Sequence, residues 1–168
     1  MSAQSQSKPN KFEVVKRIVE TISNELDAIE RSAQAAHEAA THEESRSEDS
    51  HDTRSIEAGY LAGAQASRGA DLKKLLIVYR ELSIRDFLPG ESAAVGALVR
   101  ATLDDKPGWY FIVGAGAAGL TIEQGGARVQ VVTVRSPLGE ALIGRKAGEL
   151  TELESQRGSI EIEVLEVN

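Results

Sequence analysis

Apolar residues recur at spacings of three and four along two stretches in the first half of the chain. The first stretch covers 11–48 without a glycine or proline, and the second covers about 52–82. Such spacing places the apolar side chains on one stripe of a helix. The pattern predicts two long helices, each of about 35 residues and therefore roughly 50 Å long.

The two apolar stripes match each other if the chain folds back on itself. Facing residues of an antiparallel hairpin have numbers with a nearly constant sum, and the apolar pairs here add to between 96 and 98. The pairs are Val15 with Leu82, Ile18 with Tyr79, Ile22 with Leu75, Leu26 with Leu72, Ala33 with Ala64, Ala36 with Leu61, and Ala40 with Ile56. Large residues gather at the open end and small ones toward the fold-back near 48–49, so the sequence predicts a thin, projecting helical hairpin over 11–86.

The second half of the chain has the pattern of a small β-rich domain. Pro89-Gly90 in "FLPGES" indicates a linker at 87–93, and the polar residues 1–10 indicate a disordered tail. β-prone runs follow within 94–168, with turns at "DDKPG", Gly125-Gly126 and 157–158. Ser136 as N-cap and Pro137 at the first helical position predict one short helix that ends near Gly144. The predicted fold is α+β: a helical hairpin, then a mainly antiparallel sheet with one short helix.

Composition narrows the classes of function. The net charge is −7, so long-range attraction to nucleic acid phosphates, and with it autonomous DNA binding, is not expected. The absence of cysteine excludes disulfides, zinc–thiolate sites and thiol catalysis. The first residues lack the apolar stretch of a signal peptide, and no window is apolar enough to cross a membrane. We therefore expect a soluble, cytoplasmic protein.

The stretch "FIVGAGAAGL" at 111–120 contains the pattern G-x-G-x-x-G. In a dinucleotide-binding domain, a helix must begin at once after these glycines, because its N-terminus holds the pyrophosphate. Here the chain continues with β-branched residues and reaches Gly125-Gly126 within a few positions, which leaves no room for that helix. The pattern alone is a weak signal, so we interpret the stretch as a small-residue loop between two strands.

Acidic residues gather where the hairpin should turn. The segment "HEESRSEDSHDTRSIE" at 42–57 holds Glu43, Glu44, Glu48, Asp49, Asp52 and Glu57. One interpretation is a polar turn whose acids cap the second helix. The other is a carboxylate cluster at the end of a thin arm, which could complete a magnesium site in another protein, because Mg²⁺ takes only one or two protein carboxylates.

Several motifs resemble those of the bacterial GreA/GreB transcript-cleavage factors. The block "SPLGEALIGRKAGE" at 136–149 is similar to the block S-P-(I/L)-(G/A)-x-(A/G)-L-(I/L)-G-(K/R)-x-x-G-(D/E) of that family. "WYFIVG" at 109–114 resembles its Y-x-I-V-G strand, and "SIEIEVLEV" at 159–167 resembles its closing strand. The motif match is specific for the last third of the chain, and the architecture agrees over 11–168.

This resemblance implies a fold, a partner and a function. The C-terminal domain would be FKBP-like without isomerase activity, and the partner would be bacterial RNA polymerase. The hairpin would enter the secondary channel of the polymerase, where two tip acids help to bind the second catalytic Mg²⁺ and orient a water. The polymerase would then cleave its own backtracked RNA, so the protein is not expected to be a self-sufficient enzyme. Two-metal phosphodiester hydrolysis does need a second cation and a positioned water.

The tip residues are assigned from the same resemblance. The family tip reads roughly D-x-x-E-N-A-E-Y, and residues 45–52 read S-R-S-E-D-S-H-D. Glu48 matches the family glutamate, whereas Ser45 stands at the aspartate and follows Glu44 directly. We therefore expect Glu48 and Glu44 to share the Mg²⁺, with Asp49 and Asp52 as possible substitutes.

The loop after "IVG" is acidic in the family and belongs to the surface that meets the polymerase. Here Gly114, Ala115 and Gly116 carry no charge, and we expect them to lie at a partner surface together with Ser136 and Pro137. Two other functions stay open: a regulator or inhibitor that occupies the channel without stimulating cleavage, and a scaffold whose hairpin binds some other protein. We expect a monomer.

Overall fold

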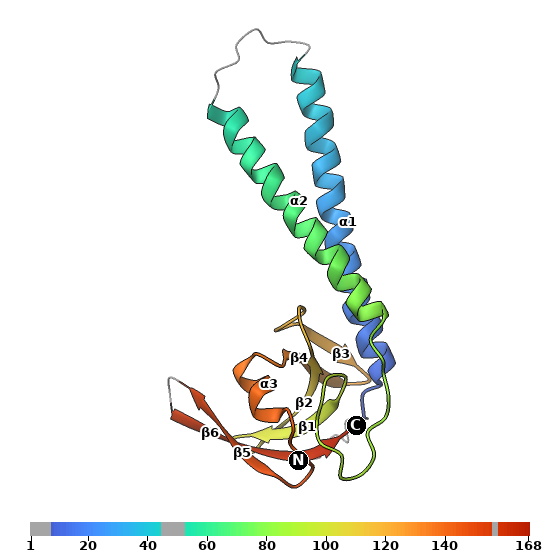
Figure 1. Cartoon of the computed structure of the whole chain (residues 1–168), viewed down its shortest axis with the longest axis vertical. Helices are drawn as coiled ribbons and strands as arrows, with labels where there is room; N and C mark the ends of the chain where they lie inside the picture. Colours follow the sequence, from blue (N-terminus) through green and yellow to red (C-terminus); the bar gives the residue numbers. More distant parts are fainter. Residues whose placement is uncertain (1–7, 45–52, 156–157) are drawn as a thin grey trace. The chain divides into compact units, whose positions relative to one another are not determined.

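The computed structural model describes residues 8–44, 53–155 and 158–168, and its fold is α+β as predicted (Figure 1). Two long helices are followed by a six-stranded sheet that carries one short helix. The elements are α1 (Lys11–Glu44), α2 (Thr53–Arg80), β1 (Leu98–Leu103), β2 (Lys106–Val113), β3 (Thr121–Gln124), β4 (Ala127–Thr133), α3 (Pro137–Leu142), β5 (Leu150–Ser155) and β6 (Gly158–Val167).

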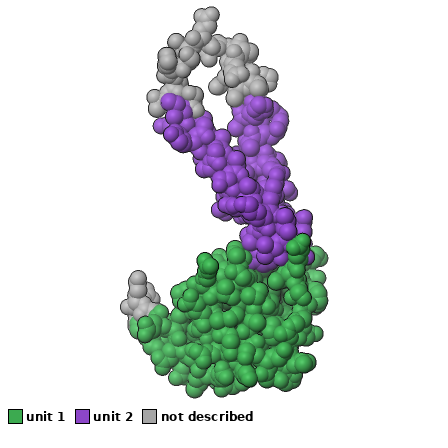
Figure 2. Space-filling model, in the orientation of Figure 1, with its two compact units in different colours: residues 1–18, 81–168 green, residues 19–80 purple. Residues whose placement is uncertain are grey.

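The chain forms two compact units (Figure 2). One unit, called the C-terminal unit below, joins Met1–Ile18 to Glu81–Asn168. The other, called the hairpin unit, is Val19–Arg80. This grouping differs from the expected linker at 87–93, because Phe87 and Ala93 are buried in the core of the first unit. It also places the start of α1 with the C-terminal residues.

The strand order in the sheet is β3-β4-β2-β1-β6-β5. All neighbouring pairs are antiparallel except β2 and β4, which run parallel from Trp109 opposite Val129 to Val113 opposite Thr133. The prediction of a mainly antiparallel sheet is therefore right, with this one pair as an exception. Asp104 and Asp105 both have positive φ, 48° and 63°, as a tight two-residue turn between β1 and β2 requires. The FKBP-like resemblance stays a prediction.

The core of the C-terminal unit is mostly aliphatic. Its buried side chains come from the linker region, β1, β2, β4, α3 and β6: Phe87, Ala93, Ala97, Val99, Ala101, Tyr110, Ile112, Val132, Leu142, Ile162 and Val164. Val99, Ile112, Leu142, Ile162 and Val164 are among the side chains that are fully inaccessible to solvent. Burial of these side chains is the main favourable contribution to the stability of this unit.

Helix α3 begins as the sequence predicts and packs closely against the chain before it. The Ser136 hydroxyl accepts a hydrogen bond from the Gly139 amide at 3.1 Å and donates one to the Thr133 carbonyl at 2.8 Å. A Cβ on Gly139 would lie 1.8 Å from that carbonyl oxygen, far inside contact distance. A side chain at 139 would therefore require the helix or Thr133 to shift, and the close approach lets Leu142 reach the core.

The segment before α1 is held against the C-terminal residues. Lys8 forms an ion pair with Glu166 at 3.1 Å, and the Asn10 amide donates to the Gln124 side chain at 2.8 Å. Lys11 is only 6% exposed, donates to the Arg85 carbonyl and lies 5.3 Å from the ring of Phe87. The prediction of a disordered tail is wrong for residues 8–10. Residues 1–7 lie outside the described residues.

In the hairpin unit, α1 and α2 pack through large apolar side chains near the end of α2. Ile22, Leu26, Leu72, Leu76 and Tyr79 are buried, and a Cβ on Gly69 would lie 3.7 Å from Leu26. Leu26 and Leu72, one of the predicted pairs, are thus both buried, while the register of their pairing stays a prediction. Lys73 and Glu30 form a cross-helix ion pair at 2.9 Å, but both side chains are exposed, so it adds little stability.

Toward the tip, the small residues that were predicted to face each other are not buried between the helices. Ala33, Ala36 and Ala64 are exposed, and Leu61 is 62% exposed. The helices draw apart toward residues 44 and 53 (Figure 1). Alanine side chains bury too little apolar area to hold two helices together without larger neighbours. The side chain of Ala40 lies outside the described residues.

Replacing Gly139 with alanine should destabilise the C-terminal unit by about 1–3 kcal/mol, because the new methyl overlaps the Thr133 carbonyl and the chain must shift to accommodate it. Urea unfolding followed by the fluorescence of the single, buried Trp109 measures this. Gly114→Ala is the matched control, since open space surrounds a Cβ there. Equal midpoints for the two variants would contradict the packing assigned to Gly139.

Tyr79 should make the hairpin less stable at alkaline pH. Burial raises the pKa of Tyr79 from 10.0 to about 12, so the native state keeps a phenol proton that the unfolded chain loses. The contribution of the Tyr79 phenol to the free energy of unfolding is complete below pH 10. It is lost as pH rises toward 12, by about 2–3 kcal/mol in total.

Urea unfolding followed by far-UV circular dichroism, at pH values below 10 and near 12, tests this for the wild type and Tyr79→Phe. The phenylalanine variant should lose less stability on raising the pH. Tyr60→Phe is the control, because Tyr60 is 79% exposed and should behave as the wild type. Parallel pH profiles for wild type and Tyr79→Phe would show that Tyr79 does not couple to folding.

Candidate functional site

The first candidate site is the segment that joins the two long helices. Helix α1 ends at Glu44 and α2 begins at Thr53. Glu48, Asp49 and Asp52 lie outside the described residues, and so does the side chain of Glu44. The assignment of these acids to a shared Mg²⁺ therefore stays a prediction.

The second candidate site is the glycine-rich loop between β2 and β3. These strands are not neighbours, since β4 lies between them, so the loop must span two strand spacings, roughly 10 Å. Gly116, Ala117 and Gly119 adopt positive φ of 65°, 50° and 79° in this crossing. The loop then joins β4: the Gly119 amide donates to the Val131 carbonyl and the Val131 amide donates to the Leu120 carbonyl, at 3.1 and 2.8 Å. The glycines thus serve a sharp change of chain direction.

This geometry confirms that the loop is not a dinucleotide-binding turn. Gly119 is followed by Leu120 and then by strand β3 from Thr121, not by a helix. No helix N-terminus is available after these glycines to hold a pyrophosphate.

The structure brings the two predicted partner-binding segments to the same end of the sheet. β2 and β4 are parallel with Val113 opposite Thr133, so the loop after β2 and the start of α3 both leave from their carboxyl ends. The Val134 amide donates to the Val113 carbonyl at 3.0 Å, which ties the two exits together. Gly114, Ala115, Gly116 and Pro137 are exposed there, and Ser136 is half-buried.

The chemistry of this end of the sheet is restricted. Residues 114–120 offer backbone amides, carbonyls and small apolar side chains, and no charged group. The Ser136 hydroxyl already makes both hydrogen bonds of the helix cap. The loop 114–120 can therefore contact a partner only through shape and backbone groups, and the exposed charges beside it are Arg135 and Glu140 at the start of α3.

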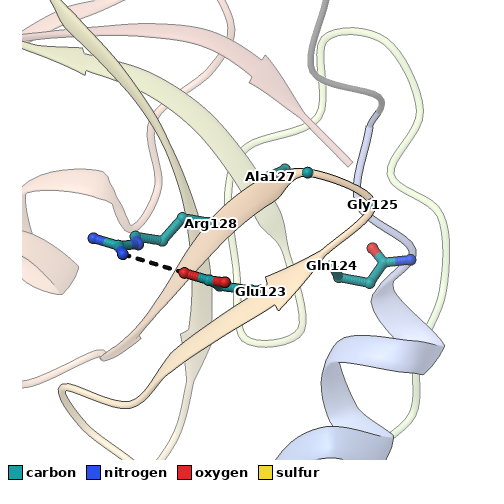
Figure 3. Close-up of a pocket in the computed structure, with 6 residues that line it drawn as sticks. Glu123, Gln124, Gly125, Ala127 and Arg128 are labelled. Carbon is teal, nitrogen blue, oxygen red and sulfur yellow. Dashed lines mark hydrogen bonds and ion pairs between the residues drawn. The ribbon is translucent and has the colours of Figure 1, made fainter.

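A shallow hollow at the β3–β4 turn was not anticipated from the sequence. It has a volume of about 350 Å³ and is lined by residues 123–128 (Figure 3). Its two charged side chains, Glu123 and Arg128, form an ion pair with each other at 3.2 Å. Because they neutralise each other, the hollow lacks the convergent polar groups of a ligand site.

Metal-binding groups and membrane spans were also sought. Within 8–44, 53–155 and 158–168, no three histidine, aspartate or glutamate side chains come together as metal ligands. No helix in the described part of the chain is long and apolar enough to cross a bilayer.

Comparison with known proteins assigns the C-terminal unit. Residues 89–168 match the family model "Transcription elongation factor, GreA/GreB, C-term". Residues 89–168 are therefore similar to the C-terminal domain of the GreA/GreB family. The transcription elongation factor GreA of Streptococcus agalactiae is 34% identical over 93 residues, and that of Streptococcus pneumoniae is 32% identical over 93 residues. Each alignment covers 54% of this chain and 54% of the relative, so the chain spans about half the length of the curated relatives it matches.

Solved structures of the same family are also similar to this chain. The GreA factor homolog 1 (Gfh1) of Thermus thermophilus is 19% identical with a TM-score of 0.37, over 89% of this chain and 94% of that protein. Gfh1 of Thermus aquaticus is 22% identical with a TM-score of 0.40, over 89% and 92%. A GreA/GreB factor from Nitrosomonas europaea is 17% identical with a TM-score of 0.36, over 58% and 78%.

The match to GreA/GreB includes the block 136–149. The structure shows what several residues of this block do in the fold. Ser136 caps α3, Pro137 occupies its first position, Gly139 allows the close approach to Thr133, and Gly144 has a φ of 77° after the helix. These residues are needed to build the GreA/GreB domain whether or not they touch a partner. A partner-binding role for Ser136 and Pro137 stays a prediction.

Ser136→Ala should destabilise the GreA/GreB domain by about 1 kcal/mol, because the variant loses the hydroxyl that caps α3. The urea midpoint of Trp109 fluorescence measures this loss. Ser159→Ala is a matched control: its exposed hydroxyl donates to Glu152 at 3.0 Å, and surface changes usually stay within about 0.5 kcal/mol. An unchanged midpoint in Ser136→Ala would leave its hydroxyl free for a role in binding.

Proposed function

We propose that this protein binds bacterial RNA polymerase and stimulates the polymerase to cleave its own backtracked RNA. In this proposal the hairpin of α1 and α2 enters the secondary channel. The observation that carries the proposal is the match of residues 89–168 to the GreA/GreB C-terminal domain. The second support is the pair of helices of 34 and 28 residues, whose ends at Glu44 and Thr53 flank the acidic segment.

The proposed chemistry rests on carboxylates at the tip. Glu48 and Glu44 would share the second Mg²⁺ of the polymerase, with Asp49 and Asp52 as substitutes. A carboxylate is a suitable ligand because Mg²⁺ is a hard cation that prefers oxygen. Bound there, the ion would stabilise the developing charge of phosphodiester hydrolysis and help to activate a water. The acids of this chain would hold the ion and orient that water.

We place the reaction itself in the polymerase. Mg²⁺ takes only one or two protein carboxylates and keeps several waters, so the acids of this segment would supply only part of the ion's coordination sphere. The C-terminal unit would act as the docking part, through the end of the sheet that presents Gly114–Gly116 and the start of α3.

A second candidate function is a regulator that occupies the channel without stimulating cleavage. Two observations favour it. The loop 114–119 is uncharged where the family resemblance leads us to expect acids, and Ser45 stands where the family tip has an aspartate. Both changes remove negative charge from places that would contact the polymerase or its metal.

Stalled, backtracked elongation complexes with Mg²⁺ separate these functions. The wild-type protein should shorten the nascent RNA, and Glu48→Ala should lower the cleavage rate by about 10–100-fold, as expected for loss of a metal-site partner. Binding to the polymerase should be nearly unchanged, and added Mg²⁺ should restore part of the activity. Glu57→Ala is the control, because Glu57 is an exposed acid on α2 beyond the tip.

Each other result assigns a different function. Polymerase binding without added RNA cleavage in the wild type identifies the non-cleaving regulator. A Glu48→Ala variant that cleaves at the wild-type rate shows that Glu48 is not the essential acid. Failure to bind the polymerase at all would support a scaffold whose hairpin binds some other protein.

A further inference from the structure

A groove in the C-terminal unit lies between the turn at 87–91 and the end of β6. It has a volume of about 270 Å³, and it is lined by residues 87–91, Ala147 and residues 165–168. Each of the two main segments presents a leucine, since Leu88 is 68% exposed and Leu165 is 38% exposed. Small-molecule sites usually have volumes of about 300–1,000 Å³, so this groove suits an amino-acid side chain better than a cofactor.

The turn that forms one wall of the groove is held in shape by several hydrogen bonds. The Glu91 carboxylate accepts from the Leu88 amide at 2.6 Å and pairs with Arg85 at 2.8 Å. The Glu91 amide donates back to the Leu88 carbonyl at 3.0 Å. Pro89 and Gly90 occupy the two central positions, and the φ of 87° at Gly90 suits such a turn. The turn therefore keeps Leu88 at the surface beside the groove.

The first described residues of the chain reach the edge of the same groove. Lys8 forms an ion pair with Glu166 at 3.1 Å and donates to the side-chain oxygen of Asn168. Both partners of Lys8 line the groove. Pro9 is buried, and a residue that precedes proline is restricted to extended conformations. The point from which residues 1–7 depart is therefore fixed beside the groove.

We propose that residues 1–7, "MSAQSQS", bind in this groove of the same chain, with the apolar side chains of Met1 and Ala3 against Leu88 and Leu165. Seven extended residues span up to about 23–25 Å, which is ample because the chain departs at the edge of the groove. Methionine is flexible and fills irregular apolar gaps well. The bound segment covers both leucines, so a partner protein reaches this surface only after the segment is displaced.

The charges of the groove also suit this segment. Glu91 and Glu166 line the groove, and residues 1–7 contain no acidic side chain that either carboxylate would repel. The serine and glutamine side chains of the segment can donate hydrogen bonds to these carboxylates at the rim.

The covalent connection to Lys8 makes a weak contact sufficient. A short flexible linker holds its ends at an effective concentration in the millimolar range, so an intrinsic dissociation constant of about 1 mM would keep the groove occupied roughly half of the time. Burial of apolar side chains favours binding, and the ordering of the segment opposes it. A separate molecule at micromolar concentration lacks the advantage of the linker. The chain's own segment is therefore a better occupant than a second copy.

Paramagnetic relaxation enhancement in the full chain tests where the segment lies. The chain has no cysteine, so Ser2→Cys carries one nitroxide and leaves Met1 and Ala3 in place. Relative to the reduced nitroxide, the amide signals of Leu88 and Leu165 should be lost to broadening. Persistence of both signals would overturn the proposal.

The β3–β4 turn serves as the internal reference. Glu123 is 75% exposed, and an unbound segment would reach it too, because the Asn10 amide donates to the neighbouring Gln124 side chain at 2.8 Å. The Glu123 amide signal should persist when the segment is in the groove. Equal broadening at Glu123 and Leu88 would show an unbound segment and would also overturn the proposal.

Two leucine variants test the apolar contact. Leu88→Glu should restore the Leu165 amide signal, because the bound segment would have to bury a carboxylate against apolar side chains. Leu150→Glu is the matched control, since Leu150 is 61% exposed and lies on β5 outside the groove. It should keep the wild-type broadening. An unchanged pattern in Leu88→Glu would exclude the leucine contact, and far-UV circular dichroism checks that each variant is folded.

A mixed sample separates binding within one chain from binding between copies. It combines ¹⁵N-labelled wild type without nitroxide and unlabelled Ser2→Cys with nitroxide. The ¹⁵N signals of Leu88 and Leu165 should stay sharp. Broadening in this sample would place the segment of one copy in the groove of another, against the proposal.

Discussion

The close approach of Gly139 to the Thr133 carbonyl is the contact on which the C-terminal unit depends. It brings α3 directly against the end of β4, where Leu142 can enter the core with Ile162 and Val164. A side chain at 139 would require the helix or the end of β4 to shift. Because the core is built almost entirely of aliphatic residues, its stability depends on tight packing more than on polar contacts. The same approach fixes where the chain leaves β4, and so it shapes the end of the sheet that carries the second candidate site.

The hairpin follows a different rule along its length. Near the end of α2, large side chains such as Leu72, Leu76 and Tyr79 are buried and hold the helices together. On α1, every residue from Arg31 to Ala39 is exposed to solvent. There the helices rely on their own backbone hydrogen bonds and on helix-forming residues.

Cap residues, turn residues and apolar periodicity predicted most helices and strands. The features that these patterns missed depend on contacts between distant segments of the chain. Turn and cap residues such as Gly125-Gly126, Ser136 and Gly144 act within a few positions, so their effects are visible in the sequence. The constant-sum rule picked residues that are buried where the pairs are large, as for Leu26 and Leu72. It failed for Ala36 and Leu61, because the rule counts register but not the area that each pair can bury. The ion pair of Lys8 with Glu166 and the parallel pairing of β2 with β4 connect distant segments without any periodic signal.

The loop after β2 is uncharged, and its backbone geometry explains only part of its sequence. Gly116 and Gly119 have positive φ, and the crossing over β4 requires residues that tolerate it. Ala115 and Ala118 have no such restriction and are exposed, so an acid could occupy either position without strain. Even the φ of 50° at Ala117 would admit an aspartate, since Asp104 and Asp105 of this chain adopt 48° and 63°. The crossing therefore does not demand an uncharged loop. The backbone therefore does not explain why residues 114–120 carry no charge. An uncharged loop favours a partner contact through shape and backbone groups over one through ion pairs.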